Sequence, residues 1–175
     1  MIFLKKEKFK EGKKMSHFSM LILTAGIPGS GKTTWVKEYC EHYPLTYVVS
    51  TDEIRKERNN GVYYCDANES DFIHQLAMSR VKDILEDPEN YKGSRLLGPC
   101  IIVDSTNCDV EDWLKYKALG AAVILVKYFD VPPEVADKRQ QGREDKIVPF
   151  QVLQEKWEKL QENKKYFKFI FNMIL

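Results

Sequence analysis

The sequence predicts an α/β fold: a three-layer sandwich around a mostly parallel sheet of about five strands. Short runs rich in Val, Ile and Leu alternate along the chain with longer segments that can form helices, an order typical of parallel sheets covered by helices. Polar residues rarely interrupt the apolar runs, as is typical of strands buried on both faces. The 175 residues suffice for one domain with its own core.

The predicted elements follow this alternation in order. We expect four strands, near Met20–Thr24, Tyr47–Ser50, Cys100–Asp104 and Ala122–Tyr128. Helices are expected near Thr33–His42, Glu69–Leu85, Val110–Leu119, Pro133–Gln140 and Pro149–Leu160. A fifth strand is expected at Phe167–Phe171, where the chain again becomes aromatic and apolar.

Charge divides the chain into two parts. Residues 1–18 are expected to be a basic, disordered tail, and residues 19–175 a single domain, because residues 1–20 carry six Lys and two Glu while the rest sums to −3. An acidic body argues against a long basic groove for nucleic acid, but not against a site that binds one end of a nucleic-acid strand.

Without an apparent secretion or membrane segment, and with four cysteines that lack metal-ligand spacing, we expect a cytoplasmic protein.

A phosphate-binding loop follows the first predicted strand. Gly26–Thr33 has the pattern G-x-x-x-x-G-K-[ST] and opens directly into the next helix. Its glycines let backbone N–H groups close around phosphate oxygens, and the helix N-terminus adds its positive dipole end. Lys32 would reach the β- and γ-phosphates of ATP, and the Thr33 hydroxyl would hold Mg²⁺. The expected nucleotide contacts are Gly26, Pro28, Gly29, Ser30, Gly31, Lys32, Thr33 and Thr34.

Two motifs that are absent narrow the class of phosphate-loop protein. The chain has no Asn-Lys-x-Asp segment of the kind that reads guanine, and Ser105 rather than a water-activating Glu follows Asp104. Transfer to an acceptor is therefore favoured over hydrolysis, which leaves the small P-loop kinases, with ATP and Mg²⁺ as cofactors.

Asp52 and Arg55 follow the second strand, at the edge of the sheet where ligands bind in doubly wound folds. Asp52 could orient an acceptor hydroxyl and take its proton, and Arg55, one helical turn on, could bind an acceptor phosphate. The alternative is a plain helix start with Thr51 as N-cap. That alternative explains Asp52 but not a cation in the first turn.

Asp104, Thr106 and Asn107 end the third strand. Asp104 suits a water-mediated Mg²⁺ contact. Thr106 and Asn107 would face the same crevice as acceptor contacts, or Asn107 or Asp109 would cap the next helix.

Arg139 and Arg143 lie four residues apart, with Gly142 between them. A mobile lid that carries arginines over the transferring phosphates would have this spacing. A solvated charged helix face is the alternative, and spacing alone leaves both open.

Together these residues resemble the kinase domain of the polynucleotide 5′-hydroxyl kinases, including its bacteriophage members, over about residues 21–160. The loop matches Gly-x-Pro-Gly-Ser-Gly-Lys-[Ser/Thr]-Thr-Trp through Trp35, and Asp52 and Arg55 match Asp-x-x-Arg. Phe129-Asp130-Val131-Pro132 resembles the junction that leads to the family's lid, whose two arginines then align with Arg139 and Arg143.

The resemblance implies a role for each matched position. Lys32 and Thr33 would bind ATP and Mg²⁺, Asp52 would be the general base, and Arg55 would contact the 3′-phosphate of the acceptor nucleotide. Arg143 would stabilise the transferring phosphate and Arg139 would support the donor. Apolar contacts to the acceptor base would come from Val148, Pro149 and Val152.

The sequence also departs from the phage pattern. Thr51 stands where the phage enzyme has a basic residue, and Asp104-Ser105 reverses its Ser-Asp order, as in bacterial and mammalian relatives. No Asp-x-Asp phosphatase motif is present, so we expect that repair would require a separate phosphatase and ligase.

We therefore interpret the protein as an ATP-dependent kinase of polynucleotide 5′ ends. One alternative is a kinase of a small hydroxylated metabolite or antibiotic, similar to zeta toxins or chloramphenicol phosphotransferase, which the acidic body favours. Another is a nucleotide-binding module or slow ATPase. The sequence does not indicate an oligomeric state.

Overall fold

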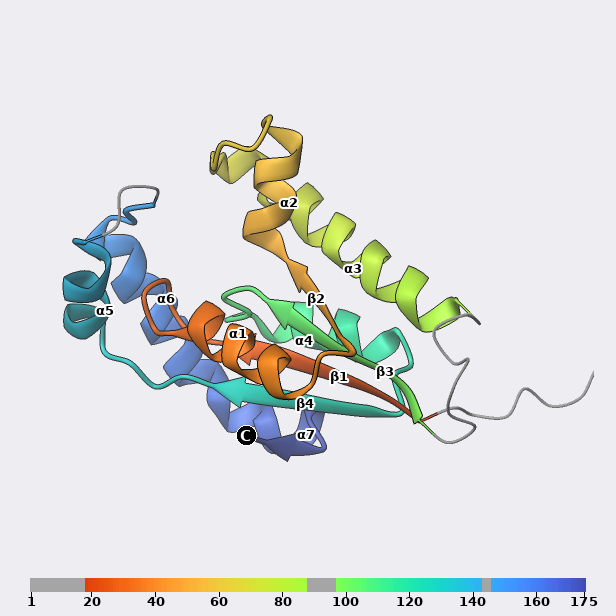
Figure 1. Ribbon diagram of the computed structural model, residues 1–175. Helices are drawn as coiled ribbons and strands as arrows, with labels where there is room; N and C mark the ends of the chain where they lie inside the picture. The colour runs from red at the N-terminus through yellow and green to blue at the C-terminus, as the bar shows by residue number, and fades with distance from the viewer. Residues whose placement is uncertain (1–17, 88–96, 143–145) are drawn as a thin grey trace, which may run out of the picture.

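The computed structural model describes residues 18–87, 97–142 and 146–175. These residues form one five-stranded sheet in which all paired strands are parallel, in the order β2-β3-β1-β4-β5. The strands are β1 (Phe18–Ala25), β2 (Thr46–Ser50), β3 (Leu97–Asp104), β4 (Val123–Tyr128) and β5 (Met173–Ile174). The strand that leads into the phosphate loop, β1, is therefore central, between β3 and β4 (Figure 1).

Helices connect the strands and cover the sheet. The α-helices are α1 (Lys32–His42), α2 (Thr51–Arg58), α3 (Ser70–Glu86), α4 (Val110–Ala118), α5 (Pro133–Gln140), α6 (Phe150–Asn163) and α7 (Phe167–Ile170). Short 3₁₀ turns span Ala67–Glu69 and Lys164–Tyr166.

Side chains of β1 alternate between two cores, which gives the fold its three layers. Leu21 and Leu23 belong to the larger core, packed with α3, α4, α6 and α7, whereas Ile22 belongs to a smaller core with Val36 of α1. Successive strand residues point to opposite faces of a sheet, so a continuous apolar run is what a strand covered on both sides requires. The predicted three-layer α/β fold is confirmed.

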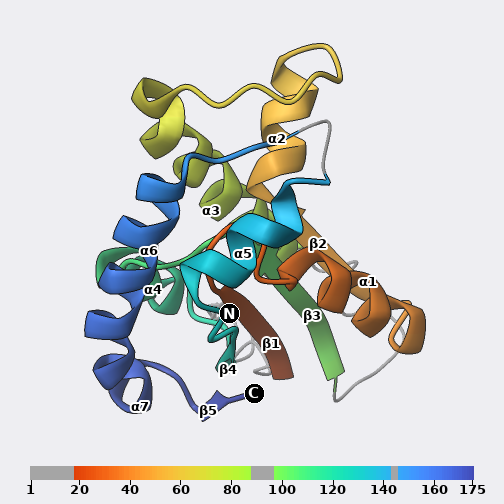
Figure 2. The same cartoon turned by 90° about the vertical axis from the view of Figure 1, so that its left-hand side faces the viewer.

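A third small cluster anchors the functional edge of the sheet. Ile27 of the phosphate loop, Ala136 of α5 and Leu153 of α6 are buried against one another. Because this cluster ties the loop to two helices, α5 and α6 lie beside the carboxyl ends of the strands. In the view of Figure 2, α2 lies above α5.

The structure corrects two expectations. Phe167–Phe171 is not the fifth strand: Phe167–Ile170 forms α7, and β5 follows at Met173–Ile174. Phe167, Ile170 and Phe171 are buried together near Trp113, a spacing that suits a helix face better than alternating strand positions. The N-cap of α2 is Ser50, whose hydroxyl accepts from the Glu53 N–H at 3.4 Å, and not Thr51.

Most of the predicted tail, residues 1–18, lies outside the described residues. Among the residues that are described, no helix is both long and apolar enough to cross a membrane.

Candidate active site

The phosphate loop connects the buried end of β1 to the N-terminus of α1. Gly29 and Gly31 have φ angles of +80° and +98°, which favour glycine. A Cβ at Gly29 would lie 2.6 Å from the Ala136 carbonyl oxygen, so the loop could not pack on α5 with any other residue there. The loop sequence thus specifies both the turn and its contact with α5.

Lys32 is buried within this loop. Its ammonium donates to the Ile27 carbonyl at 2.8 Å and lies 3.4 Å from the Ser30 hydroxyl. Burial lowers the pKa of Lys32 to about 8, with the negative charge of Asp104 opposing the shift. A buried cation with few negative partners is well suited to receive the charge of nucleotide phosphates.

Thr33 and Asp104 come together where β1 and β3 end. The Thr33 hydroxyl donates to Asp104 Oδ2 at 2.8 Å. Burial raises the pKa of Asp104, and the bond from Thr33 and the charge of Lys32 oppose that rise. One hydroxyl and one carboxylate fit Mg²⁺, which keeps several waters and takes its remaining ligands from substrate phosphates. When bound, Mg²⁺ would neutralise negative charge on those phosphates.

Asp52 is placed by the junction of β2 and α2. The buried Thr51 hydroxyl donates to Ser105 Oγ at 3.1 Å, which fixes the start of α2 against the end of β3. Asp52 Oδ1 accepts from Arg55 Nη1 at 3.3 Å, and Oδ2 accepts from Lys146 Nζ at 2.5 Å. The Asp52 side chain is 38% exposed. The candidate base therefore has two cationic partners and remains open to an acceptor.

A cavity of about 890 Å³ joins these groups. Its lining includes most of the residues that the sequence predicts for the site: Pro28, Gly29, Ser30, Gly31, Lys32, Thr33, Thr34, Asp52, Arg55, Asp104, Thr106, Arg139, Val148 and Val152. Residues from the loop, α2, the end of β3, α5 and α6 thus meet around one space large enough for a nucleotide and part of an acceptor.

A few predicted residues lie elsewhere. Asn107 is 1% exposed, has a φ of +40°, and donates its amide to the Thr24 carbonyl at 2.7 Å, so it holds β1 to the chain after β3. Gly26 donates its N–H to the Thr106 carbonyl at 3.0 Å, and Pro149 is the N-cap residue of α6. Neither Asn107 nor these two residues line the cavity. Arg143 lies outside the described residues.

Sequence reasoning missed several residues around the cavity. Trp35 and Phe129, which belong to the matched loop and junction motifs, also line it, as does Tyr63. The residues that were missed are Glu38, near the loop, and Cys65, Ser70, His74, Lys146 and Lys156, around Asp52 and Arg55. These side chains come from segments far apart in the sequence and belong to no compact motif. The identity of Lys146 gave one weak signal, a cation close to the predicted lid, but nothing indicated Asp52 as its partner.

The fold and the site define a P-loop protein with the architecture of the small kinases. The chain belongs to the family described as an AAA domain, whose model matches residues 21–165.

Solved structures with this fold include both macromolecular assemblies and metabolite kinases. A chain of the Pnkp1/Rnl/Hen1 RNA repair complex is similar with a TM-score of 0.71 and 22% identity, over 90% of this chain and 49% of that one. A gluconokinase from Sinorhizobium meliloti matches with a TM-score of 0.54 and 18% identity, over 85% and 78% of the two chains. Shikimate kinase from Acinetobacter baumannii matches with a TM-score of 0.54 and 9% identity, over 91% of this chain and 83% of that one. The protein spans about half the length of the repair-complex chain.

Proposed function

We propose that the protein transfers the γ-phosphoryl group of ATP to the 5′-hydroxyl end of a polynucleotide. The observation that carries this proposal is the Asp52–Arg55 pair in the phosphate-loop cavity, with 3.3 Å between Asp52 Oδ1 and Arg55 Nη1. A base for a hydroxyl and a cation for a phosphate, one helical turn apart, suit an acceptor that carries both groups. A nucleotide at a 5′ end, with its 3′-phosphate, has that chemistry.

The proposed reaction assigns a role to each of the predicted groups that line the cavity. Lys32 and the loop N–H groups bind the donor phosphates, while Thr33 and Asp104 would hold Mg²⁺. Asp52 orients the 5′-hydroxyl and accepts its proton as the new P–O bond forms and ADP leaves. Arg55 holds the acceptor's 3′-phosphate, Thr106 adds a polar contact, and Val148 and Val152 contact the acceptor base. Arg139 supports the donor, and we assign Arg143 to the transferring phosphate.

A comparison supports this choice, and two observations favour a second candidate. The similar chain with the higher TM-score belongs to an assembly named for RNA repair. Separate phosphatase and ligase partners are part of this proposal. Gluconokinase and shikimate kinase share the fold, however, and the body of this chain is acidic. Phosphorylation of a small hydroxylated metabolite is therefore the second candidate.

A panel of acceptors separates the two candidates. Wild-type protein with ATP and Mg²⁺ is offered 5′-hydroxyl oligonucleotides of increasing length, nucleoside 3′-monophosphates, and sugar acids or other polyols. We expect kcat/KM to be highest for acceptors with a 3′-phosphate. Efficient phosphorylation of a polyol without measurable use of any nucleotide acceptor would contradict the polynucleotide acceptor and support the second candidate.

Arg55→Ala should distinguish acceptors by their 3′-phosphate. A hydrogen bond to a charged group contributes about 1.5–3 kcal/mol, so we expect kcat/KM to fall roughly 10- to 100-fold further for a nucleoside 3′-monophosphate than for the matching nucleoside. The control is Arg58→Ala, since Arg58 is exposed on the same helix, pairs with Glu69 and does not line the cavity. Equal losses on both acceptors would remove the assigned role of Arg55.

A further inference from the structure

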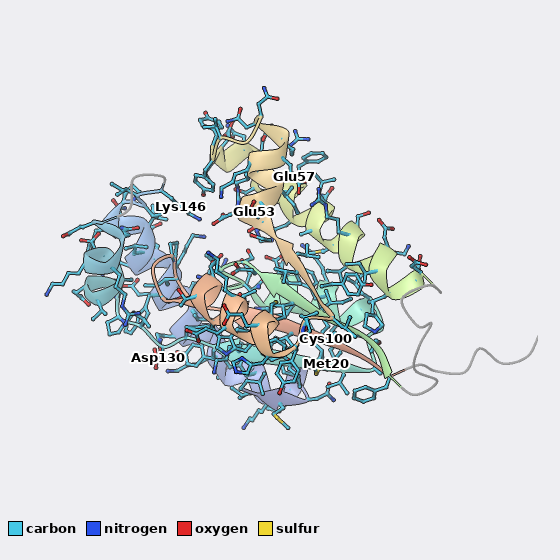
Figure 3. The ribbon with its side chains drawn as sticks, viewed as in Figure 1. Met20, Glu53, Glu57, Cys100, Asp130 and Lys146 are labelled. Atoms are coloured by element: carbon cyan, nitrogen blue, oxygen red, sulfur yellow. The ribbon has the colours of Figure 1, made fainter. Side chains whose placement is uncertain are left out.

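Lys146 lies between α5 and α6 and extends toward α2 (Figure 3). Its ammonium is 2.5 Å from Asp52 Oδ2 and 4.7 Å from the centre of the Tyr63 ring, and only 16% of its side chain is exposed. A surface lysine normally keeps its charge in water. This one is held against the candidate base.

The backbone near Lys146 is anchored by a buried side chain of α5. Gln140, which is 1% exposed, donates to the Val148 carbonyl at 2.6 Å and accepts from the Val148 N–H at 3.1 Å. Val148 is therefore held at both its N–H and its C=O, two residues after Lys146. The backbone two residues from Lys146 is thus fixed to α5, beside the cavity that Lys146 lines.

Lys146 also lies within electrostatic reach of the donor side of the site. It lines the main cavity and an adjoining one of about 400 Å³, and Thr33, Asp52 and Asp104 line both as well. The Lys146 side chain therefore shares the main cavity with Lys32, the residue assigned to the donor phosphates.

The contacts of Asp52 pose a chemical problem that Lys146 can solve. Arg55 bonds one carboxylate oxygen and Lys146 the other, and an oxygen bonded to an ammonium is a poorer acceptor for a hydroxyl proton. A γ-phosphate carries more negative charge than one carboxylate, so it would compete for Lys146. The lysine stem is flexible enough to exchange one partner for the other.

We propose that Lys146 is a further catalytic cation of the phosphoryl transfer, which pairs with Asp52 before substrates bind and with oxygens of the transferring phosphoryl group during the reaction. In that step the acceptor oxygen bonds to the γ-phosphorus, the bond to the β-phosphate oxygen breaks, and ADP leaves with that electron pair. The hydroxyl proton goes to Asp52, and Lys146 keeps its own proton throughout. This inference rests on phosphoryl transfer as proposed above, but not on the identity of the acceptor.

The first test needs no acceptor. Dissociation constants are measured for ADP with Mg²⁺, with and without aluminium fluoride as a mimic of the transferring phosphoryl group, in wild type, Lys146→Met and Lys146→Arg. We expect Lys146→Met to weaken the fluoride complex about 10- to 100-fold and ADP alone by less than about threefold. Lys146→Arg should restore most of the loss. The control is Lys138→Met, an exposed α5 lysine that does not line the cavity.

The second test is turnover with the best acceptor that the panel identifies. Lys146→Met should lower kcat by about 10-fold or more and change the acceptor KM by less than about threefold, because the contact forms in the transition state. A higher kcat would mean that Lys146 only blocks Asp52, and unchanged values in both tests would mean that it has no catalytic role; either result overturns the inference. Thermal unfolding confirms that each variant is folded.

The two tests separate this inference from the proposed function. Loss of fluoride binding in Lys146→Met, with no wild-type activity on any oligonucleotide, would contradict the polynucleotide acceptor and support the role of Lys146. Wild-type activity on oligonucleotides, with fluoride binding and kcat unchanged in Lys146→Met, would support the polynucleotide acceptor and contradict the role of Lys146.

Discussion

Asp52→Asn is expected to lower kcat by about 10²- to 10⁴-fold, the usual contribution of a general base, while ATP binds about as well as to wild type. Asparagine has nearly the same shape but cannot take the proton of the acceptor hydroxyl. Asp52 contacts Arg55 and Lys146 rather than the phosphate loop, so its loss should not weaken ATP binding, and Lys146 released toward the γ-phosphate would only strengthen it. Single-turnover transfer and an ATP-binding titration give the two values.

The matched control is Glu53→Gln. Glu53 follows Asp52 on α2, pairs with Lys56, has a side chain that is 61% exposed, and does not line the main cavity. The same change of charge at this position should leave kcat within about twofold of wild type, as for most surface substitutions. An Asp52→Asn protein that binds ATP and transfers phosphate at the wild-type rate would exclude Asp52 as the base.

Lys32→Met should abolish most activity without destabilising the fold. Loss of one buried cation from a site that stabilises transition-state charge costs about 10²- to 10³-fold in kcat, and ATP affinity should fall as well. The folded state already disfavours the Lys32 charge, since burial lowers its pKa to about 8. Methionine removes that cost, which is on the order of a few kcal/mol below pH 8. Thermal unfolding at pH 7 should therefore show an unchanged or higher Tm.

The control for Lys32 is Lys82→Met, on the exposed side of α3, where Lys82 pairs with Glu86 and does not line the cavity. It should change neither activity nor ATP affinity by more than about twofold. A Lys32→Met protein with wild-type kcat would contradict the assignment of the loop. A marked loss of Tm would instead mean that the Lys32 bond to the Ile27 carbonyl stabilises the fold.

The parts of the fold that were predictable are those with local signals. The apolar run Leu21–Leu23 indicates a buried strand because a glycine-rich loop follows it closely, and the glycine pattern of that loop specifies a turn with positive φ angles. The expectation of a strand at Phe167–Phe171 was wrong because five residues rich in aromatics fit both the two-residue period of a strand and the 3.6-residue period of a helix. Only the packing of Phe167 and Ile170 onto Trp113 and its neighbours selects the helix.

The candidate site shows the same division between local and tertiary information. Asp52 and Arg55 could be paired from the sequence because they lie one turn apart on a single helix. The pairing of Asp52 with Lys146 joins residues 94 positions apart, and the two bonds of Gln140 to Val148 follow from how α5 meets α6. Asn107 was expected in the crevice, but its amide donates to the Thr24 and Val103 carbonyls, which no local pattern predicts.

The measurement that tests the central claim most directly is transfer of labelled γ-phosphate from ATP, with Mg²⁺, to a 5′-hydroxyl oligonucleotide and to its 5′-phosphorylated twin. We expect label on the first oligonucleotide and none on the second, because only the first presents a hydroxyl to Asp52. Label on neither, with ATP still bound, would contradict a polynucleotide 5′-kinase and favour a small-molecule acceptor.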